Sequence, residues 1–378
     1  MKKKLAIIGA GIAGLTFANF IKKDSNFEFT IYEKEDSLTL EEGFGIQLAP
    51  NSVSILNKIG FNKIDSQKIY HPKNLNFYSL NNEKICELDF EQINSNNIKY
   101  TTLQRSTLIE FLKDEVYSQH LRFGKRIKKV SEIKDKLLIN FEDNSNDLVD
   151  YIIAADGIFS NTRTFFESKK NEPIFNNALV VRSILKSRKE LLIDDNSINL
   201  LMGSRSHIVI YPINNNNKEL NLVSIIREKK FDPDSINDLI NKKVLSQNSN
   251  FKNLFQGDLK SWPLYASNTA LPSSNKKVFY LGDAFYGFLP TMAQGASQSI
   301  EGAFDLFNLF KENNNDASNI YFKKRLERTK LIKKRSNFNF FAFHISNPII
   351  KTIRNAILKR LVKKKDFISS YLGRVYKN

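Results

Sequence analysis

The sequence predicts an α/β fold in which a parallel β-sheet is interrupted by an inserted antiparallel sheet and followed by C-terminal helices. An apolar run at Lys3–Ile8 leads directly into a glycine-rich turn and a helix-like segment. Two later apolar runs, at Asp150–Ala155 and Val278–Leu281, also end in turns that precede helices. Between them, the residues from Ala178 to Arg227 alternate with a period of two, which is typical of antiparallel strands. Strand–turn–helix units flanking such a segment predict a sheet inserted into an α/β domain.

The glycine-rich turn at residues 9–14 has the spacing Gly-x-Gly-x-x-Gly. In a strand–turn–helix context, Gly9 permits the tight turn, Gly11 lets the backbone approach a pyrophosphate, and Gly14 allows close packing of the helix on the sheet. The N-terminus of that helix favours phosphate groups. The acidic residue Glu33 follows the next apolar run, where it can accept hydrogen bonds from ribose hydroxyls. These features predict a Rossmann-like dinucleotide site.

Two further junctions carry an aspartate. Asp156-Gly157 follows one buried run, and Ser160 is placed to cap a short helix; by itself this segment is equally consistent with a plain turn. Asp283 follows the other buried run, and a loop of small residues then leads into a helix expected from Gly295 to Phe310. A carboxylate near a helix N-terminus suits a polar ring that takes up negative charge.

Other elements are read from capping and periodicity. Pro50-Asn51 suggests a helix capped by Asn51, and Arg105 opens an amphipathic helix. Residues 73–90 alternate as in strands, and residues 231–255 have helical character.

Composition excludes several classes of function. The single cysteine, Cys86, excludes internal disulfides and a cysteine-based zinc site, and the four histidines lack metal-ligand spacing, so no metal site is predicted. The net charge is +17, but the first 322 residues contribute only +2, so a broad nucleic-acid-binding surface is not indicated. The N-terminal lysines resemble the start of a signal segment, but glycines break the apolar run, which favours a first strand and a cytoplasmic protein.

The last segment is strongly basic. From Lys323 to Asn378 there are 17 Lys and Arg residues against two acidic residues. Ile349, Ile353, Ile357 and Leu361 recur at helical spacing, with lysines and arginines mainly away from them. Such a helix could lie on an anionic membrane. The commoner arrangement, in which the apolar stripe packs on the protein's own core, is the one favoured here.

Taken together, the three junctions resemble the motifs of group A flavoprotein monooxygenases, the para-hydroxybenzoate hydroxylase class. The order of the motifs, Arg105 and the loop Gly43-Phe44-Gly45-Ile46 fit this family. The sequence departs from it at Phe285-Tyr286-Gly287, where many relatives carry a histidine, and at Glu301-Gly302, where Glu-Asp is common. The FAD-contacting residues implied by the resemblance are Gly9, Gly11, Ile12, Ala13, Gly14, Glu33, Lys34, Gly45, Arg105, Asp156, Gly157, Asp283, Gln294, Gly295, Ala296 and Ser297.

The resemblance also implies the chemistry. FAD would be reduced by NADH or NADPH and would react with O2 to give a flavin hydroperoxide that hydroxylates an aromatic, phenolic substrate. No catalytic side chain is implied, although Pro290 would line the reactive ring. Arg182, His207 and Tyr211 of the inserted sheet are candidate substrate contacts, and each has a structural alternative as a strand-face cation, a loop residue or a packed aromatic.

Several alternatives stay open at this stage. The C-terminal run most resembles salicylate- and urate-hydroxylase-type enzymes, with ubiquinone-pathway phenol hydroxylases as the near alternative. The latter would act on a prenylated quinone precursor. A flavin reductase, a ring epoxidase or a non-catalytic FAD-binding protein would carry the same motifs, because the motifs specify FAD and not the acceptor.

The predicted division of the chain is discontinuous. The FAD-binding domain comprises residues 1–72, 101–170 and 275–310. The substrate domain comprises residues 73–100 and 171–274, and basic C-terminal helices occupy residues 311–378.

Overall fold

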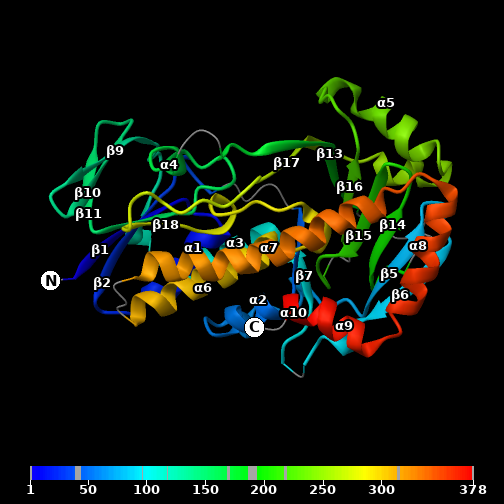
Figure 1. Cartoon of the computed structure of the whole chain (residues 1–378), viewed down its shortest axis with the longest axis horizontal. Helices are drawn as coiled ribbons and strands as arrows, with labels where there is room; N and C mark the ends of the chain where they lie inside the picture. Colours follow the sequence, from blue (N-terminus) through cyan, green and yellow to red (C-terminus); the bar gives the residue numbers. More distant parts are fainter. Residues whose placement is uncertain are drawn as a thin grey trace.

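The computed structural model describes residues 2–38, 44–95, 97–116, 118–167, 171–185, 194–216, 219–312 and 316–376. A five-stranded parallel sheet in the order β18-β12-β1-β2-β8 lies on the left in Figure 1. The strands are β1 (Lys3–Ile8), β2 (Phe27–Tyr32), β8 (Leu121–Arg122), β12 (Tyr151–Ala154) and β18 (Val278–Tyr280). The three apolar runs that precede the sequence motifs are therefore neighbours, which brings their turns to one edge of the sheet.

Helix α1 (Ile12–Ile21) packs on β1 and β2, and α3 (Arg105–Asp114) and α6 (Gly295–Lys311) pack on α1. Helix α2 (Pro50–Asn57) packs on α6, and the short α4 (Asn161–Thr164) follows β12. Phe20 of α1 stacks on Phe307 of α6 with ring centroids 5.4 Å apart, so aromatic side chains pack these two helices together. The expected cap at Asn51 is wrong, because α2 begins one residue earlier, with Pro50 in its first turn after Ala49. Asn51 is buried instead and donates a hydrogen bond to Glu301 at 3.0 Å.

The inserted region forms a seven-stranded sheet in the order β17-β13-β16-β15-β14-β5-β6, on the right in Figure 1. All its pairs are antiparallel except β14 with β5. Its strands are β5 (Asn74–Ser79), β6 (Lys84–Asp89), β13 (Ile174–Leu185), β14 (Ile198–Met202), β15 (Ser206–Pro212), β16 (Leu220–Ile226) and β17 (Lys260–Ala266).

Two small antiparallel sheets complete the strands. One contains β9 (Ile127–Ile133), β10 (Lys136–Phe141) and β11 (Asn146–Val149), and the other contains β3 (Gly45–Leu48), β4 (Ile69–Tyr70) and β7 (Thr101–Gln104). The helical segment expected at residues 231–255 consists of short pieces, of which α5 (Ile236–Ile240) is α-helical.

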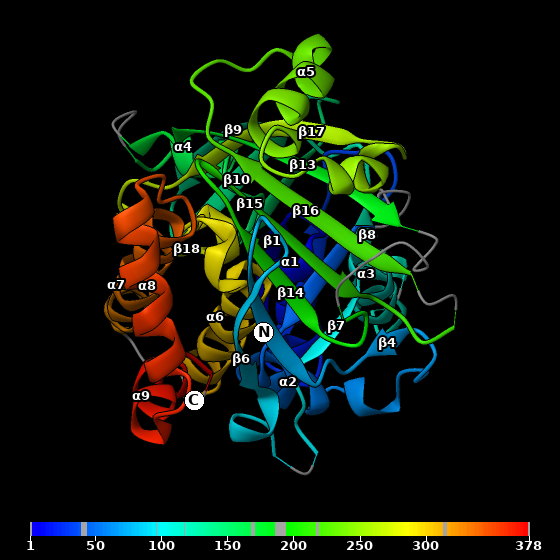
Figure 2. The ribbon, with the colours of Figure 1, turned by 90° about the vertical axis from the view of Figure 1, so that its right-hand side faces the viewer.

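The C-terminal residues form a helical layer along one side of the molecule, as Figure 2 shows. The 27-residue α7 (Ala317–Phe343) is followed by α8 (Pro348–Leu361), α9 (Lys365–Tyr371) and α10 (Gly373–Tyr376). In the described part of the chain, no helix combines the length and apolar character needed to cross a membrane.

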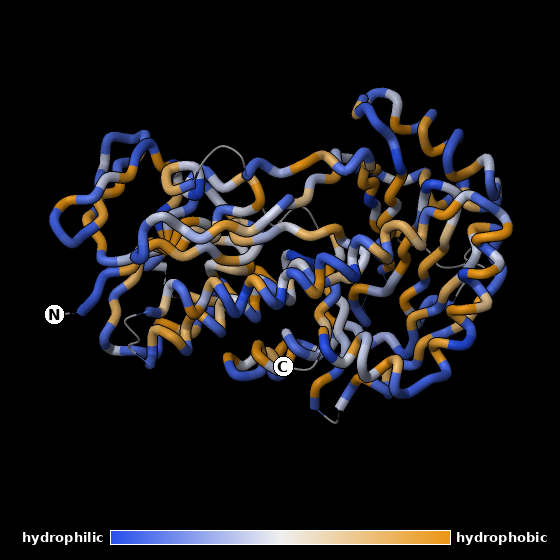
Figure 3. Tube along the Cα trace, in the orientation of Figure 1, coloured by the Kyte–Doolittle hydropathy of each residue, from blue (hydrophilic) through white to orange (hydrophobic). Residues whose placement is uncertain are grey.

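The favoured arrangement of α8 is wrong. Ile349, Ile353 and Ile357 of its apolar stripe are 71%, 52% and 50% exposed, whereas Arg354 on the opposite face is buried. The helix therefore turns a basic residue towards the protein and isoleucines towards solvent. Figure 3 shows the mixture of hydrophobic and hydrophilic positions along α8 at the right-hand edge.

Candidate active site

The glycine turn after β1 combines two tightly packed positions with one open position. A Cβ on Gly9, which has φ +104°, would lie 2.5 Å from the Ala155 carbonyl oxygen, and one on Gly14 would lie 2.1 Å from the Gly9 carbonyl oxygen. A Cβ on Gly11 would meet no atom within 4 Å. Gly9 and Gly14 thus make the turn compact, while Gly11 leaves room for a ligand at the N-terminus of α1. Ile12 and Ala13 form the first helical turn there.

Glu33 lies directly after β2, beside this turn. Its Oε2 accepts a hydrogen bond from the Ala10 N–H at 2.8 Å, which places the carboxylate next to the open position at Gly11. Lys34 is exposed and lies 3.6 Å from the Glu35 carboxylate. The arrangement fits an adenosine ribose at Glu33.

The Asp156-Gly157 turn after β12 is tied together by its own residues. Ser160 Oγ, Thr162 N and Thr162 Oγ1 all donate to the Asp156 carboxylate, at 2.5, 3.0 and 2.8 Å. Ser160 also caps α4 by accepting from Arg163 N, as expected from the sequence. Arg163 in turn donates to the Ala284 carbonyl oxygen at 3.1 Å. The Asp156 side chain thus holds its own turn together, and Arg163 links that turn to the Asp283 turn; the assignment of Asp156 to the cofactor is a prediction.

The Gly282-Asp283 turn after β18 presents its carboxylate differently. Asp283 is exposed, but to a cavity rather than to the outer surface. Because surrounding protein restricts access to bulk water, the pKa of Asp283 rises to about 6, while the nearby Arg105 guanidinium acts in the opposite direction. Arg105 opens α3, and its N–H donates to the Phe44 carbonyl oxygen at 2.9 Å.

The N-terminus of α6 adjoins the same cavity, which Pro290, Gly295 and Ala296 help to line. A Cβ on Gly295 would meet nothing within 4 Å, so the backbone is accessible to a planar ring. Gln294 and Ser297 are buried instead. The Ser297 hydroxyl lies 2.9 Å from that of Ser52, so its side chain joins α6 to α2, and only its backbone N–H remains suited to the site.

The cavity has a volume of about 950 Å³ and extends from Asp283 along the seven-stranded sheet to the C-terminal helices. Gly45 lies in its wall, where a Cβ would approach the Asn221 side chain to 2.7 Å. Gly43 lies outside the described residues. The three predicted substrate contacts, Arg182, His207 and Tyr211, all line this cavity.

Arg182 and Tyr211 belong to one polar group in this wall. The Arg182 guanidinium lies 5.6 Å from the centre of the Trp262 ring. Burial raises the pKa of Tyr211 to about 12, although Arg182 and a hydrogen bond with Gln47 act in the opposite direction. Gln47 Oε1 also accepts from Tyr100 OH at 2.8 Å. Sequence reasoning missed Gln47 and Tyr100, because neither lies in a motif.

His207 pairs with His344, 137 residues later in the chain. Their facing nitrogens, Nδ1 of His207 and Nε2 of His344, are 2.7 Å apart, and Arg227 Nε donates to His344 Nδ1 at 3.1 Å. Burial lowers the pKa of His207 to about 3 and that of His344 to about 2, where His207 adds to the effect. Both rings are therefore neutral, His344 donates from Nε2, and His207 carries its proton on Nε2. No sequence spacing indicates this pair.

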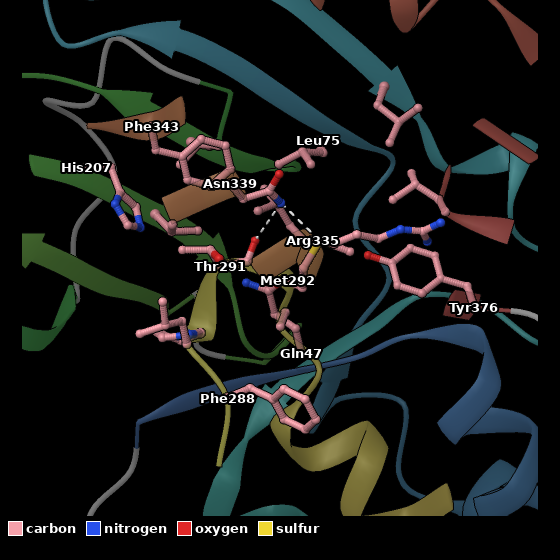
Figure 4. Close-up of a pocket in the computed structure, with 18 of the residues that line it drawn as sticks. Gln47, Leu75, His207, Phe288, Thr291, Met292, Arg335, Asn339, Phe343 and Tyr376 are labelled. Atoms are coloured by element: carbon pink, nitrogen blue, oxygen red, sulfur yellow. Dashed lines mark hydrogen bonds between the residues drawn. The ribbon is translucent and has the colours of Figure 1, made fainter. Parts of the chain in front are cut away.

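Figure 4 shows Asn339 beside Thr291 and Met292 in the wall of the cavity. Asn339 Nδ2 donates to the Thr291 carbonyl oxygen at 3.2 Å and contacts Met292 Sδ at 3.0 Å. Thr291 Oγ1 donates to the Ser336 carbonyl oxygen at 2.7 Å. Helix α7 thereby fixes one wall of the cavity at the N-terminus of α6.

The geometry of these residues fits a bound FAD. The space at Gly11 lies beside Glu33, and the Asp283 carboxylate and the open backbone at Gly295 lie at the same cavity. The ends of neighbouring strands thus provide an accessible helix N-terminus, a carboxylate beside it and a cavity, which is the arrangement expected of a dinucleotide site. Within the described ranges, no group of three or more His, Cys, Asp or Glu residues is arranged to hold a metal ion.

A family model described as "FAD binding domain" matches residues 2–328. The chain belongs to this family. The 6-hydroxynicotinate 3-monooxygenase of Bordetella bronchiseptica is 24% identical over 375 residues, covering 92% of this chain and 94% of the relative. A 3-amino-4-hydroxybenzoate 2-monooxygenase of Streptomyces platensis is 24% identical over 384 residues, covering 98% and 96%.

Solved structures agree on the fold. HpxO of Klebsiella pneumoniae, complexed with FAD and uric acid, superposes with a TM-score of 0.86 at 17% identity, covering 99% of this chain and 96% of that one. A salicylate hydroxylase substrate complex gives a TM-score of 0.81 at 17% identity, covering 100% and 96%. The resemblance to group A FAD-dependent aromatic monooxygenases is confirmed, and the protein is an FAD-dependent monooxygenase.

Proposed function

We propose that this monooxygenase hydroxylates an aromatic ring that carries an acidic group, a carboxylate or a phenol. The observation that carries the proposal is the charge of the cavity. Its described lining includes Arg182, Lys334, Arg335 and Arg374, against the single acid Asp283 at the flavin end. An anionic aromatic would be attracted to such a cavity and oriented within its otherwise apolar walls. The names of the two relatives, a hydroxynicotinate and an aminohydroxybenzoate monooxygenase, describe substrates of this chemistry.

The protein's part in the reaction is binding, orientation and electrostatics. Bound FAD supplies the chemistry, the transfer of one oxygen atom from O2 with NADH or NADPH as reductant. Gly9–Gly14 and Glu33 would hold the ADP portion, and Asp283 the ribityl chain. The N–H groups at the start of α6 would stabilise negative charge on the ring. Arg182 and Tyr211 would orient the acidic group of the substrate, with Gln47 fixing the Tyr211 hydroxyl.

The test is a screen of hydroxylated aromatic acids and phenols with the purified holoenzyme. We expect FAD to be released by acid precipitation. One class of aromatic acid should stimulate NADH or NADPH oxidation and yield a hydroxylated product. Stimulated oxidation that gives only hydrogen peroxide, with no oxygenated product for any compound, would contradict the proposed hydroxylation and favour a reductase. Recovery of an epoxide would identify the ring epoxidase instead.

A ring with a long apolar substituent, such as a prenylated quinone precursor, is a second candidate. It is supported by the extent of the cavity, which continues past the polar residues to Leu358 and Leu361 of α8 and Phe367 of α9. Comparing a phenolic acid with the same acid bearing an alkyl chain separates the candidates, because only the second predicts a lower KM for the alkylated compound. A cytoplasmic location is part of both proposals, since NADH and NADPH are needed as reductants.

A further inference from the structure

Helix α8 has an unusual distribution of side chains. Ile349, Ile350, Ile353 and Ile357 are all exposed on its outer face. Burying apolar side chains away from water is favourable, so four exposed isoleucines on one helix form a surface that gains free energy when it is covered. Contiguous apolar surface of this kind marks a contact with a partner or a membrane.

The inner face of α8 is fixed to the protein by polar contacts. Arg354 donates to the Ala342 carbonyl oxygen at 2.9 Å, and Lys351 Nζ donates to Ser204 Oγ at 2.8 Å. Leu358, Leu361 and Val362 of the same helix line the cavity. These contacts fix the orientation of α8 on the protein. The isoleucines on its other face are therefore exposed.

Charge identifies the occupant of this surface. Exposed cations continue from the end of α8 into α9, at Lys359, Arg360, Lys363, Lys364 and Lys365, with Asp366 as the one acid among residues 348–371. The preceding turns of α7 add the exposed aromatic residues Phe338 and Phe341. Apolar side chains next to a run of lysines match a bilayer, in which anionic headgroups lie above an apolar interior.

We propose that α8 and the start of α9 dock on an anionic membrane surface. The exposed isoleucines enter the headgroup layer, while Lys359 to Lys365 contact the lipid phosphates. Because the other face of α8 lines the cavity, docking places the cavity wall against the membrane. This inference concerns membrane binding alone and does not depend on which aromatic substrate the enzyme hydroxylates.

The experiment is co-sedimentation of the full-length holoenzyme with vesicles of phosphatidylcholine, alone or mixed with phosphatidylglycerol. We expect binding to the anionic vesicles at low salt, weakened at about 0.5 M salt because exposed charges are then screened. The double variant Ile353→Ser/Ile357→Ser should reduce the vesicle partition coefficient by about tenfold or more. The triple variant Lys363→Gln/Lys364→Gln/Lys365→Gln should do the same on anionic vesicles, since each lysine contributes about 1 kcal/mol there.

Matched controls use surface residues far from α8 in the chain. Ile320→Ser removes an exposed isoleucine from the beginning of α7, and Lys128→Gln/Lys129→Gln removes exposed charges from β9. Both should bind vesicles like the wild type. Absence of binding at low salt, or equal binding by the Ile353→Ser/Ile357→Ser variant, overturns the proposal. So does a dimer in light scattering that this variant converts to a monomer, because a second copy would then cover the face.

Discussion

The middle of helix α6 and its N-terminus have acidic groups in opposite environments. Midway along the helix, Glu301 and Asp305 face α7 and are surrounded by protein partners. At its N-terminus, the Asp283 carboxylate faces the cavity. Arg325 lies 2.9 Å from Glu301 and 3.0 Å from Asp305, and Arg328 lies 2.7 Å from Glu301.

The pKa values of these groups separate structural from ligand-binding acids. Burial alone would raise the pKa of Glu301, but Arg325 and Arg328 lower it to about 2. The pKa of Asp283 rises to about 6 because the surrounding protein restricts its access to bulk water, and Arg105 offsets this effect only in part. A carboxylate whose charge is paired by protein groups stabilises the fold. A carboxylate that lies at a cavity with few such partners is suited to bind a ligand.

The largest effect is expected at the α6–α7 interface. Glu301→Gln removes the charge that Arg325 and Arg328 share, and breaking a buried ion pair costs about 3–5 kcal/mol. Urea unfolding of the FAD-free protein measures the loss. Lys324→Gln is the control, because Lys324 is exposed and its pair with Asp305 is worth at most about 1 kcal/mol. Equal losses in the free energy of unfolding for Glu301→Gln and Lys324→Gln would contradict the larger contribution assigned to the buried ion pairs of Glu301.

Asp156 should behave as an intermediate case. Its carboxylate accepts three hydrogen bonds from Ser160 and Thr162, so Asp156→Ala leaves several donors without partners. A hydrogen bond to a charged group contributes about 1.5–3 kcal/mol, and we expect a loss of about that size in the free energy of unfolding. If FAD affinity falls while stability is unchanged, Asp156 belongs with the ligand-binding acids.

Asp283→Asn should leave the fold intact and weaken the cofactor. Losing a charged acceptor for a ribityl hydroxyl corresponds to about a 10- to 100-fold increase in the Kd for FAD. Flavin fluorescence during titration of the FAD-free protein measures it, and urea unfolding near pH 4, where the Asp283 carboxyl is protonated in the folded chain, should match the wild type. If Asp283→Asn binds FAD with the wild-type Kd, the ribityl chain is held by a residue other than Asp283.

Local sequence predicted the nucleotide-binding frame well, because each glycine acts within a few residues of itself. Gly9, Gly11 and Gly14 occupy one turn, and the strands that carry the three motifs lie side by side. The cavity was predicted only in part. Arg182 and Tyr211 were predicted from strand alternation. The His207–His344 pair depends on a fold that brings together two residues 137 positions apart in the chain.

The orientation of α8 shows a different limit. Periodicity identified the apolar stripe at Ile349, Ile353 and Ile357 but not the direction in which it points. That direction depends on contacts made by Arg354 and Lys351 with residues on other elements. A helix with one polar and one apolar face has the same pattern whichever face the protein covers.

A pH dependence is also expected at Asp283. Its pKa is about 6 in the folded FAD-free protein, above the 3.8 of an ordinary aspartate carboxyl group, so the folded form binds the proton more tightly. The wild type should therefore lose stability relative to Asp283→Asn as pH rises from about 4 to about 6. Glu301 has the opposite sign, since its contribution is lost as pH falls from about 4.5 to about 2. With Asp283 proposed as a charged acceptor for FAD, the FAD affinity of the wild type should also fall below about pH 6, and that of Asp283→Asn should not. Parallel urea unfolding and FAD titration of the two proteins between pH 4 and pH 8 separate these contributions. Identical pH profiles would mean that Asp283 does not titrate in this range.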